Sequence, residues 1–479
     1  MGNTESSPLS TAGKVDGRPV TFTYHRRDDI DERELIWTEN PASIGRLSTK
    51  DIIAVIPIHT QVPDDYSVLY VDSTTATKDT KTSIPGVFKS FVATKLPQPF
   101  IHDYQPPGNA CWQTRQDKSE GFPNLHIVVS TGSGTGQAEA VWEQMLKPML
   151  RHVCSLEAKD YALHFTTSEY TVTDLTCDIF LKQANLGVAQ AIVLLSGDGG
   201  MVDIVNALKS EQLSRSYVKP SVALLPLGTG NALANSAGIT GDNTMGLKTL
   251  LQGSQEELPL FCATFSPGAR LLVNEGRDER LLHTVDGTPL AHGAVVCSWG
   301  LHASLVADSD SAEYRKFGAE RFGMAAKDLL YPADGSSPHP YKGKVSVLRP
   351  SNNAKDDWQP IDRDTHGYVL ATLVSQLEKG FTISPASKPL DGKLRLVHFG
   401  PVNGEEAMAI MKKAYDGGKH ATDDRVGYEE IEGVRIQFNE EDERWRRICL
   451  DGKVIQVERG GWVEAKTGVK GVLSLIVRS

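Results

Sequence analysis

The sequence predicts an α/β domain built on a parallel sheet, followed by a mostly β domain and preceded by a small β-rich N-terminal module. The chain has 479 residues, more than the roughly 250 to 300 at which one hydrophobic core stops growing. Between Asn124 and about residue 255, apolar β-branched runs alternate with helical patterns, which is typical of βαβ units. Short strand patterns dominate on both sides of this segment.

The N-terminal module is predicted over residues 1–122. Short apolar runs between polar turns indicate antiparallel strands, and they lie at 20–24, 51–57, 66–71 and 88–93. The segment 97–108 holds four prolines and one glycine, a composition typical of a linker. We recognise no chemistry-bearing motif in this module and expect it to be accessory.

The α/β domain is predicted over residues 123–255. Its buried strands read HIVVS, YALHF, AIVLL and SVALL, and helical patterns fall at 137–150, 175–187 and 201–209. Right-handed crossovers bring the carboxyl ends of parallel strands to one edge of the sheet. Ligands of such sheets bind at that edge, so we expect the functional site there.

The mostly β domain is predicted over residues 256–479. Strand patterns lie at 293–298, 344–348, 367–374, 393–398 and 472–477, and helical patterns at 312–330 and 404–417. We expect the active site between this domain and the α/β domain, with the C-terminal part completing it.

Composition excludes several classes of function. The formal net charge of −10 and the pI near 5.8 argue against nucleic acid as a partner. The six cysteines lie far apart and form no CxxC pair, which disfavours zinc and a disulfide framework and indicates a reducing compartment. No apolar run of about 18 residues is present, so we expect a cytoplasmic or peripherally membrane-associated protein.

The first residues, MGNTES, match the pattern for N-myristoylation of Gly2. The alternative is a tail that begins with glycine by chance. A single myristoyl chain binds membranes only marginally, so stable association requires a second membrane contact.

The stretch SGDGGMVDIVNAL, residues 196–208, places Asp198 among glycines directly after a buried strand. Glycines at a strand end expose backbone N–H groups that can hold a phosphate, and the following helix adds its dipole. A carboxylate at such a place is expected to bind Mg²⁺ or to take a proton from an attacking hydroxyl. The alternative is an aspartate that caps a tight turn.

Two further glycine-rich loops follow predicted strands: STGSGTG at 130–136 and PLGTGNALA at 226–234. Neither is a Walker A motif, because no G-K-[ST] closes it. Three such loops at one sheet edge indicate a shared ligand site.

These three loops, together with SWGLHASLVADSDSAEYRKFGAERF and the LDGK near the C-terminus, resemble the diacylglycerol kinase catalytic domain superfamily, most closely its sphingosine kinase and ceramide kinase branch. The resemblance runs from about Asn124 to the C-terminus. It implies an α/β domain that binds ATP with Mg²⁺, and a β domain that covers a membrane lipid. It also implies transfer of the γ-phosphate to a primary hydroxyl, here that of a sphingoid base.

The resemblance assigns roles to individual residues. Asp198 would activate the hydroxyl, Asp308 with Ser298 would hold the amino and hydroxyl head of the acceptor, and Asp198 and Asp203 are candidates for contact with the metal of Mg-ATP. The implied nucleotide contacts are Ser130, Gly132, Ser133, Gly134, Thr166, Ser196, Gly197, Gly199, Gly228, Thr229, Gly230, Asn231, Arg315, Arg321, Asp451 and Gly452. A pocket for the lipid tail is expected near Leu301, Leu305, Phe317 and Phe322, which are equally compatible with ordinary core.

Departures from the family pattern leave alternatives open. Lys453 stands where relatives carry Glu, Asp203 where Glu is usual, and Thr135 where a lysine is common. A weakly active or inactive lipid- or nucleotide-binding protein is therefore a second hypothesis, and a diacylglycerol or ceramide kinase is an alternative for the acceptor. A soluble kinase of the NAD kinase type fits less well, because Gly200 follows the GDG turn.

Overall fold

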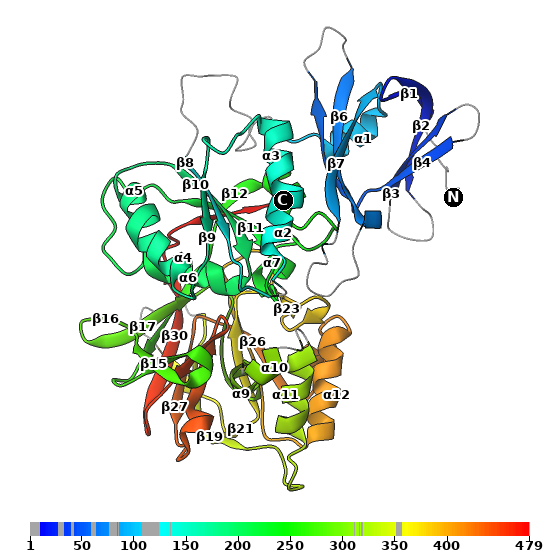
Figure 1. Cartoon of the computed structure of the whole chain (residues 1–479). Coiled ribbons are helices and arrows are strands. Elements are labelled where there is room, and N and C mark those ends of the chain that lie inside the picture. The colour runs from blue at the N-terminus through cyan, green and yellow to red at the C-terminus, as the bar shows by residue number, and fades with distance from the viewer. Residues whose placement is uncertain are drawn as a thin grey trace.

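The computed structural model describes residues 10–26, 33–39, 43–58, 64–75, 84, 86–107, 124–134, 136–310, 312–315, 317, 320–350 and 357–478. Helices surround a sheet with parallel strands in the middle of the chain, and β-rich regions lie on either side of it (Figure 1). No helix in this described part combines the length and the apolar character needed to cross a membrane.

The N-terminal residues form a seven-stranded antiparallel sheet of order β4-β3-β2-β1-β7-β6-β5. Its strands are β1 (Ser10–Val15), β2 (Arg18–Arg26), β3 (Arg33–Glu39), β4 (Ser43–Ser48), β5 (Ile52–Pro57), β6 (Asp65–Asp72) and β7 (Val87–Thr94). The predicted linker at 97–108 is wrong in part, because it contains helix α1 (Gln98–Tyr104). Proline is tolerated in the first turn of a helix, and Phe100, Ile101 and Tyr104 of α1 pack into the core of this module.

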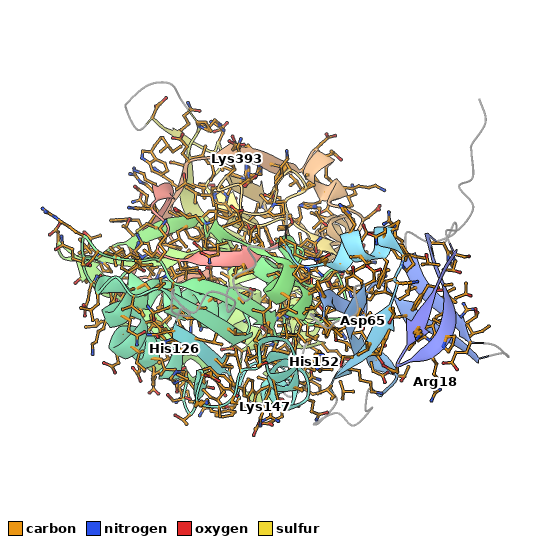
Figure 2. All side chains as sticks on the ribbon, turned by 90° about the horizontal axis from the view of Figure 1, so that it is seen from above. Arg18, Asp65, His126, Lys147, His152 and Lys393 are labelled. Atoms are coloured by element: carbon orange, nitrogen blue, oxygen red, sulfur yellow. The ribbon has the colours of Figure 1, made fainter. Side chains whose placement is uncertain are left out.

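The N-terminal module is attached to the α/β region through a shared core. Ile53 and Leu69 of the module pack in one apolar cluster with Met149 and Leu250. His152, at the edge of the α/β region (Figure 2), hydrogen-bonds through Nε2 to the hydroxyl of Ser67 at 2.9 Å. The module is therefore packed against the α/β region.

The six-stranded sheet of the α/β region has the order β12-β31-β11-β10-β8-β9. Its strands are β8 (Asn124–Val129), β9 (Ala162–Phe165), β10 (Gln190–Ser196), β11 (Ser221–Pro226), β12 (Ser254–Glu257) and β31 (Ser474–Val477). β9, β8, β10, β11 and β31 run parallel, and β12 pairs antiparallel with β31. The helices are α2 (Ala138–Val141), α3 (Lys147–Cys154), α4 (Thr171–Leu175), α5 (Leu181–Asn185), α6 (Asp198–Leu208), α7 (Ala232–Ser236) and α8 (Leu247–Gln252).

Strand β31 corrects the predicted division of the chain. The pattern at 472–477 suggested a strand of the β domain, but Ser474 and Leu475 pair with Ser221 and Val222 of β11. Figure 1 shows this red strand among the cyan and green strands of the α/β region. The polypeptide therefore leaves the α/β sheet after β12, builds the β region, and returns.

The β region consists of two antiparallel eight-stranded sheets. The first contains β13 (Leu260–Phe265), β16 (His283–Val285), β17 (Thr288–Gly293), β19 (Tyr341–Leu348), β20 (Trp358–Pro360), β21 (Thr365–His366), β27 (Gly433–Phe438) and β30 (Trp462–Val469). The second contains β14 (Arg270–Val273), β15 (Asp278–Leu281), β18 (Val296–Gly300), β22 (Tyr368–Thr372), β25 (Leu394–Phe399), β26 (Val426–Ile431), β28 (Arg447–Leu450) and β29 (Lys453–Gln456). Phe261 and Val463 of the first sheet share a buried core with Trp299 and Leu396 of the second. A short hairpin, β23 (Gln376–Glu378) and β24 (Phe381–Thr382), packs on α7.

The helices of the β region differ from the predicted pattern. The single helix predicted at 312–330 is divided into α10 (Ala312–Arg315) and α11 (Glu320–Leu330). An unpredicted helix, α9 (Leu301–Ser309), begins directly after Gly300, whose φ of +87° ends strand β18 sharply. The helix predicted at 404–417 is present as α12 (Gly404–Tyr415).

Candidate active site

The three glycine-rich loops meet at the carboxyl edge of the six-stranded sheet. A Cβ added to Gly228 would lie 2.6 Å from the Cα of Gly197, and a Cβ added to Gly134 would overlap the carbonyl oxygen of Leu227. No side chain fits at such separations. The loops after β8, β10 and β11 therefore touch through their backbones, and their glycines permit this approach.

Asp198 is the first residue of α6, and its carboxylate faces the first turn of α7. Its Oδ2 accepts the N–H of Ala232 at 2.6 Å, and its Oδ1 accepts that of Leu233 at 3.2 Å. Asn231 precedes these residues with φ +54°, and its Oδ1 accepts the N–H of Gly228 at 2.9 Å. The carboxylate of Asp198 is thus fixed in orientation by the PLGTGN loop.

Burial raises the pKa of the Asp198 carboxyl to about 6, although its two backbone hydrogen bonds oppose this shift. A carboxylate with a pKa near the working pH is suited to accept a proton and to release it again. Desolvated carboxylates of this kind are more typical of functional sites than of turn caps.

The first loop is held by contacts that the sequence did not reveal. Thr131 donates its N–H to Oγ1 of Thr166 at 3.0 Å and its hydroxyl to the Thr166 carbonyl at 2.8 Å. The N–H of Ser130 is bonded to the carbonyl of Leu195 at 3.0 Å. Thr166, predicted to contact the nucleotide, therefore supports the loop through Thr131. In the sequence, Thr131 within the glycine run is the residue from which this pairing with Thr166 could have been inferred.

Some predicted loop positions face open space. Added Cβ atoms on Gly132 and Gly199 would meet no atom within 4 Å. Ser196, in contrast, is buried, and its Oγ would lie 2.6 Å from a Cβ added to Gly200. Ser196 therefore packs beneath the loop, whereas Gly132 and Gly199 lie at its accessible side.

Asp451 lies close to Asp198, but its carboxylate is hydrogen-bonded within the β region. The backbone N–H groups of residues 294–296 donate to its carboxylate at 2.6, 3.0 and 2.6 Å. Burial raises the pKa of Asp451 to about 7, and the nearby Asp198 carboxylate adds to the shift. Asp451 and Gly452 form the β28–β29 turn with positive φ angles. The carboxylate of Asp451 therefore fixes the start of β18 beside the site, and its contact with the nucleotide stays a prediction.

Lys453, the main departure from the family pattern, forms an ion pair with Asp203 of α6. Nζ lies 2.9 Å from Oδ1, and burial raises the pKa of Asp203 while Lys453 opposes the shift. On the same helix, Asn206 Oδ1 accepts the N–H of His292, and its Nδ2 donates to the carbonyl of His292, both at 2.9 Å. These contacts tie the helix that begins with Asp198 to the β region.

The residues at this site do not form a protein-held metal centre. No group of three His, Cys, Asp or Glu side chains arranged for a metal ion occurs in the described part of the chain. Asp203, one predicted candidate, is neutralised by Lys453, and Asp198 accepts two backbone N–H groups. A magnesium ion would have to be held mainly by the phosphates of the nucleotide.

Of the two predicted arginines, the structure describes the side chain of Arg321. Arg321 lies on α11, 3.5 Å from Asp310, with its guanidinium 4.8 Å from the Phe322 ring. Arg315 ends α10, but its side chain lies outside the described part of the structure. Gly2, the predicted acylation site, also lies outside the described residues. Of the predicted tail-pocket residues, Phe317 is 46% exposed.

Asp308, predicted to hold the acceptor's head group, has its carboxylate paired with two arginines. Oδ2 lies 2.9 Å from Arg444 and Oδ1 lies 3.3 Å from Arg447. Arg447 begins strand β28, and Asp451 follows the end of this strand four positions later, about 13 Å of extended chain away. No hydrogen bond or ion pair in the described residues joins Asp308 to the glycine-rich loops. The basic run RWRR at residues 444–447 is the sequence feature that could have indicated partners for Asp308.

Ser298, the other predicted head-group contact, is fully buried in β18. Its hydroxyl lies 2.7 Å from Nδ1 of His302, whose pKa burial lowers to about 4. Ser298 therefore holds the neutral imidazole of His302, a residue in the first turn of α9.

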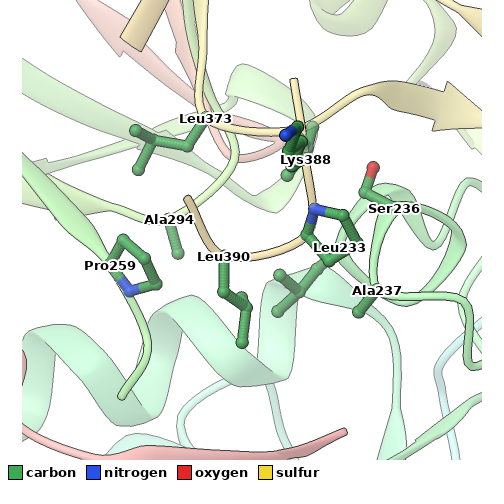
Figure 3. Close-up of a pocket in the computed structure, with 10 residues that line it drawn as sticks. Leu233, Ser236, Ala237, Pro259, Ala294, Leu373, Lys388 and Leu390 are labelled. Carbon is green, nitrogen blue, oxygen red and sulfur yellow. The ribbon is translucent and has the colours of Figure 1, made fainter. Parts of the chain in front are cut away.

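A small apolar pocket lies where α7 meets the β region (Figure 3). It is lined by Leu233, Ala237, Ala294, Leu390 and Lys388 among others. Its walls leave room for little more than one water molecule. It is therefore part of the packed junction beside Asp198 and Asp451, and it is too small for an acyl chain.

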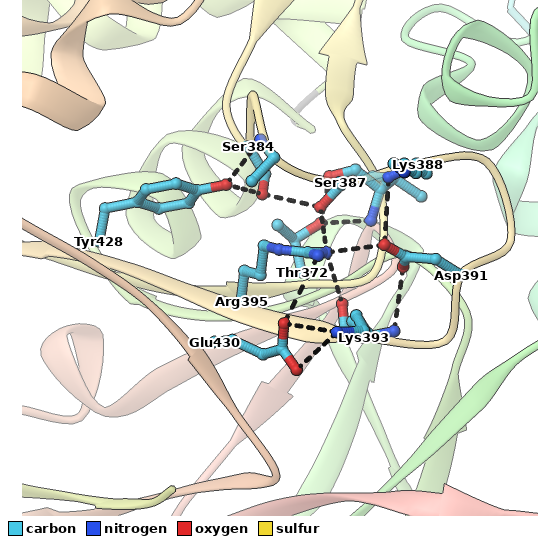
Figure 4. A network of polar contacts seen from close by, with 11 residues as sticks. Thr372, Ser384, Ser387, Lys388, Asp391, Lys393, Arg395, Tyr428 and Glu430 are labelled. Carbon is cyan, nitrogen blue, oxygen red and sulfur yellow. Dashed lines mark hydrogen bonds and ion pairs between the residues drawn. The ribbon is translucent and has the colours of Figure 1, made fainter. Parts of the chain in front are cut away.

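One wall of this junction is a loop held by a buried arginine (Figure 4). Arg395 donates through Nη1 to Ser387 and to Asp391, both at 3.0 Å, and Asp391 accepts the N–H of Lys388 at 3.2 Å. Leu390 adopts φ +52° within this loop, an unfavourable conformation for leucine. The polar network stabilises the loop that carries Leu390 into the junction.

Comparison with known proteins relates the α/β region to a family. Residues 124–263 match the diacylglycerol kinase catalytic domain. The chain carries a diacylglycerol kinase catalytic domain. It is similar to sphingosine kinase 2 of Arabidopsis thaliana, with 22% identity over 72% of each protein. It is also similar to sphingosine kinase 1 of Rattus norvegicus, with 29% identity over 46% of this chain and 51% of that protein.

The catalytic domain and these relatives make the chain an enzyme of the lipid kinase class. Among solved structures, a putative diacylglycerol kinase from Bacillus anthracis aligns with 75% of this kinase and 99% of its own chain, at 15% identity and a TM-score of 0.48.

Proposed function

We propose that the kinase transfers the γ-phosphate of ATP to the primary hydroxyl of a sphingoid base, with Asp198 as the proton acceptor. The observation that carries this proposal is the placement of the Asp198 carboxyl, with a pKa of about 6, where three glycine-rich loops touch. The names of the relatives in the comparisons support the choice of acceptor.

The loops supply what a triphosphate requires. Backbone N–H groups at accessible glycines, such as Gly132 and Gly199, and the first turn of α6 can hold phosphate oxygens. Magnesium would enter with the nucleotide and neutralise developing charge on the phosphates. The residues of this chain would chiefly bind and orient the triphosphate.

The proton movement centres on Asp198. The ionised carboxylate accepts the proton of the lipid hydroxyl as the lipid oxygen bonds to the γ-phosphorus and the bond to the bridging oxygen breaks, which releases ADP. The N–H groups of Ala232 and Leu233 use one lone pair on each carboxylate oxygen, and further lone pairs remain to accept this proton.

The test is transfer of label from ATP to lipid in detergent micelles with Mg²⁺. We expect label in sphinganine, and its loss in Asp198→Asn, which keeps the size of the side chain but cannot act as a base. Asp178→Asn, an exposed aspartate paired with Lys182, is the matched control and should keep full transfer. Transfer retained by Asp198→Asn would remove Asp198 from the mechanism.

Other acceptors are alternative outcomes of the same assay. Label in diacylglycerol or ceramide alone would retain the kinase mechanism and replace the acceptor.

A weakly active binding protein remains the second candidate. The Asp203–Lys453 ion pair favours this candidate, because Lys453 places a cation where a metal-binding acid was expected. ATP binding without label in any lipid would support it. Acylation of Gly2 and peripheral membrane association stay predictions.

A further inference from the structure

A stacked pair, Arg280 and Tyr170, joins the β region to the α/β region near the first glycine-rich loop. The guanidinium of Arg280 lies over the Tyr170 ring, with its Cζ atom 3.3 Å from the ring centroid. Arg280 belongs to β15, and Tyr170 directly precedes α4, five residues beyond the end of β9 at Phe165. A guanidinium so placed is attracted by the face of the ring. The two regions are therefore in direct contact beside the carboxyl edge of the sheet.

The hairpin that carries Arg280 is fixed within the β region. β15 pairs with β14, and β14 pairs with β29, the strand that begins with Lys453. Arg270 of β14 lies 3.1 Å from Glu279 of β15 and 2.7 Å from Glu458. Strand pairing and these ion pairs therefore place Arg280 at a defined position in the β region.

Tyr170 is connected to the first glycine-rich loop through a compact turn. Its N–H donates to Oγ of Ser168 at 3.2 Å, and the N–H of Ser168 donates to Oγ1 of Thr171 at 3.0 Å. This turn begins directly after Thr166, which holds Thr131 of the loop through two hydrogen bonds. A displacement of Tyr170 should therefore shift the backbone of the STGSGTG loop.

Two further contacts between the regions end on α6 rather than on this loop. They are the Asp203–Lys453 ion pair and the hydrogen bonds of Asn206 to the backbone of β17. Both hold the helix that begins with Asp198. The stacked pair differs from them because its connections lead to the loop after β8. The β region is thus joined both to the helix of the proposed proton acceptor and to the first glycine-rich loop.

We propose that Arg280 and Tyr170 are positioning residues for the nucleotide, because the stacked pair holds the STGSGTG loop in the arrangement that binds the triphosphate. The inference rests on the proposed function, since it takes this loop as part of the ATP site. Loss of the pair should weaken ATP binding. The proton transfer to Asp198 should be unaffected, because N–H groups of α7 hold that carboxylate.

The test separates the KM for ATP from kcat in the label-transfer assay with sphinganine. We expect Arg280→Gln and Tyr170→Leu each to raise the KM for ATP about fivefold and to leave kcat unchanged. Tyr170→Phe retains the ring face and should restore the KM of the wild type. Arg277→Gln, which removes an arginine paired with Glu275 in the same hairpin, is the matched control and should keep full activity. Wild-type KM values in both Arg280→Gln and Tyr170→Leu would overturn the inference.

A binding measurement distinguishes a failure of this inference from a failure of the proposed function. The affinity for ATP with Mg²⁺ is measured without lipid, and each substitution is placed in the Asp198→Asn protein, where no transfer is expected. The double variant Arg280→Gln/Tyr170→Leu should bind ATP no more weakly than either single variant, because both changes remove one contact.

Weaker ATP binding with this non-additivity would retain the inference even if the wild-type protein labels no sphinganine, a result that would refute the proposed function alone. Unchanged affinity in both single variants, or losses that add in the double variant, would refute the inference whether or not the protein transfers phosphate. A Tyr170→Phe protein that binds ATP as weakly as Tyr170→Leu would also refute it, because the ring would then not be the group that matters.

Discussion

Gly228→Ala provides a sharp test of the loop geometry. The added Cβ would lie 2.6 Å from the Cα of Gly197 and 2.8 Å from Oδ1 of Asn231. Ordinary contact between carbon atoms begins near 3.5 Å, so the two loops must separate by about 0.9 Å. Overpacking of this kind costs about 1–3 kcal/mol, which corresponds to a fall in Tm of about 2–4 °C per kcal/mol in a domain of 150–250 residues.

The functional effect of Gly228→Ala should exceed its effect on stability. The shift moves the PLGTGN loop, whose Asn231 holds the backbone of residue 228 and whose α7 N–H groups hold Asp198. Misplacement of reacting groups by about 1 Å can lower turnover about 100-fold. We therefore expect kcat/KM for ATP to fall by about two orders of magnitude, measured by label transfer to sphinganine.

Gly323→Ala is the matched control for this substitution. Gly323 lies in α11, and an added Cβ there would meet no atom within 4 Å. Alanine is favoured over glycine within a helix by about 1 kcal/mol, so this variant should be slightly more stable and fully active. A Gly228→Ala enzyme with the Tm and the kcat/KM of the wild type would refute the conclusion that the loops touch.

Two further predictions follow from the charges at the site. The pKa of Asp198 is raised to about 6, so kcat/KM should fall as the pH drops through about 6. Because the pKa of Asp198 is higher in the folded protein than in the unfolded chain, the stability that this shift contributes is full below pH 3.8 and is lost as the pH rises through about 6. The free energy of unfolding, measured with denaturant, should fall over this range. A flat activity profile from pH 5 to 8 would contradict the base role. The Asp203–Lys453 pair should show a coupling of about 1–2 kcal/mol in a double-mutant cycle of Asp203→Asn and Lys453→Met, between the values for exposed pairs and those for charge-assisted hydrogen bonds. Denaturant unfolding measures it, and a coupling near zero would show that the ion pair does not hold α6 to the β region.

Local pattern was sufficient to predict the elements that position the site. The apolar runs before Ser130, Ser196 and Pro226 are parallel strands, and the glycine-rich loops after them meet at one edge. Each of these signals lies within about ten residues of sequence. Parallel strands buried on both faces are read as continuous apolar runs, which explains why these segments were recognisable.

The features that were missed depend on contacts between distant residues. Asp308 is paired with Arg444 and Arg447, which lie 136 and 139 positions away, and an aspartate in an acidic run before a helical pattern carries no sign of such partners. Helix α1 was obscured by its prolines, although Phe100 and Tyr104 have the spacing of a buried helix face. Tertiary context overrides local propensity in such cases.

The pairing of β31 with β11 has a consequence for how the protein is made. Ser221 pairs with Ser474, so on a translating ribosome the β11 edge emerges long before the strand that covers it. Until residue 474 has left the exit tunnel, this apolar edge is open to other chains. The β region, inserted between β12 and β31, must fold first or together with the closure of the sheet. In nascent and prematurely terminated chains the β11 edge therefore stays unpaired, and the glycine-rich loops extend from an incomplete sheet until the β region has been made.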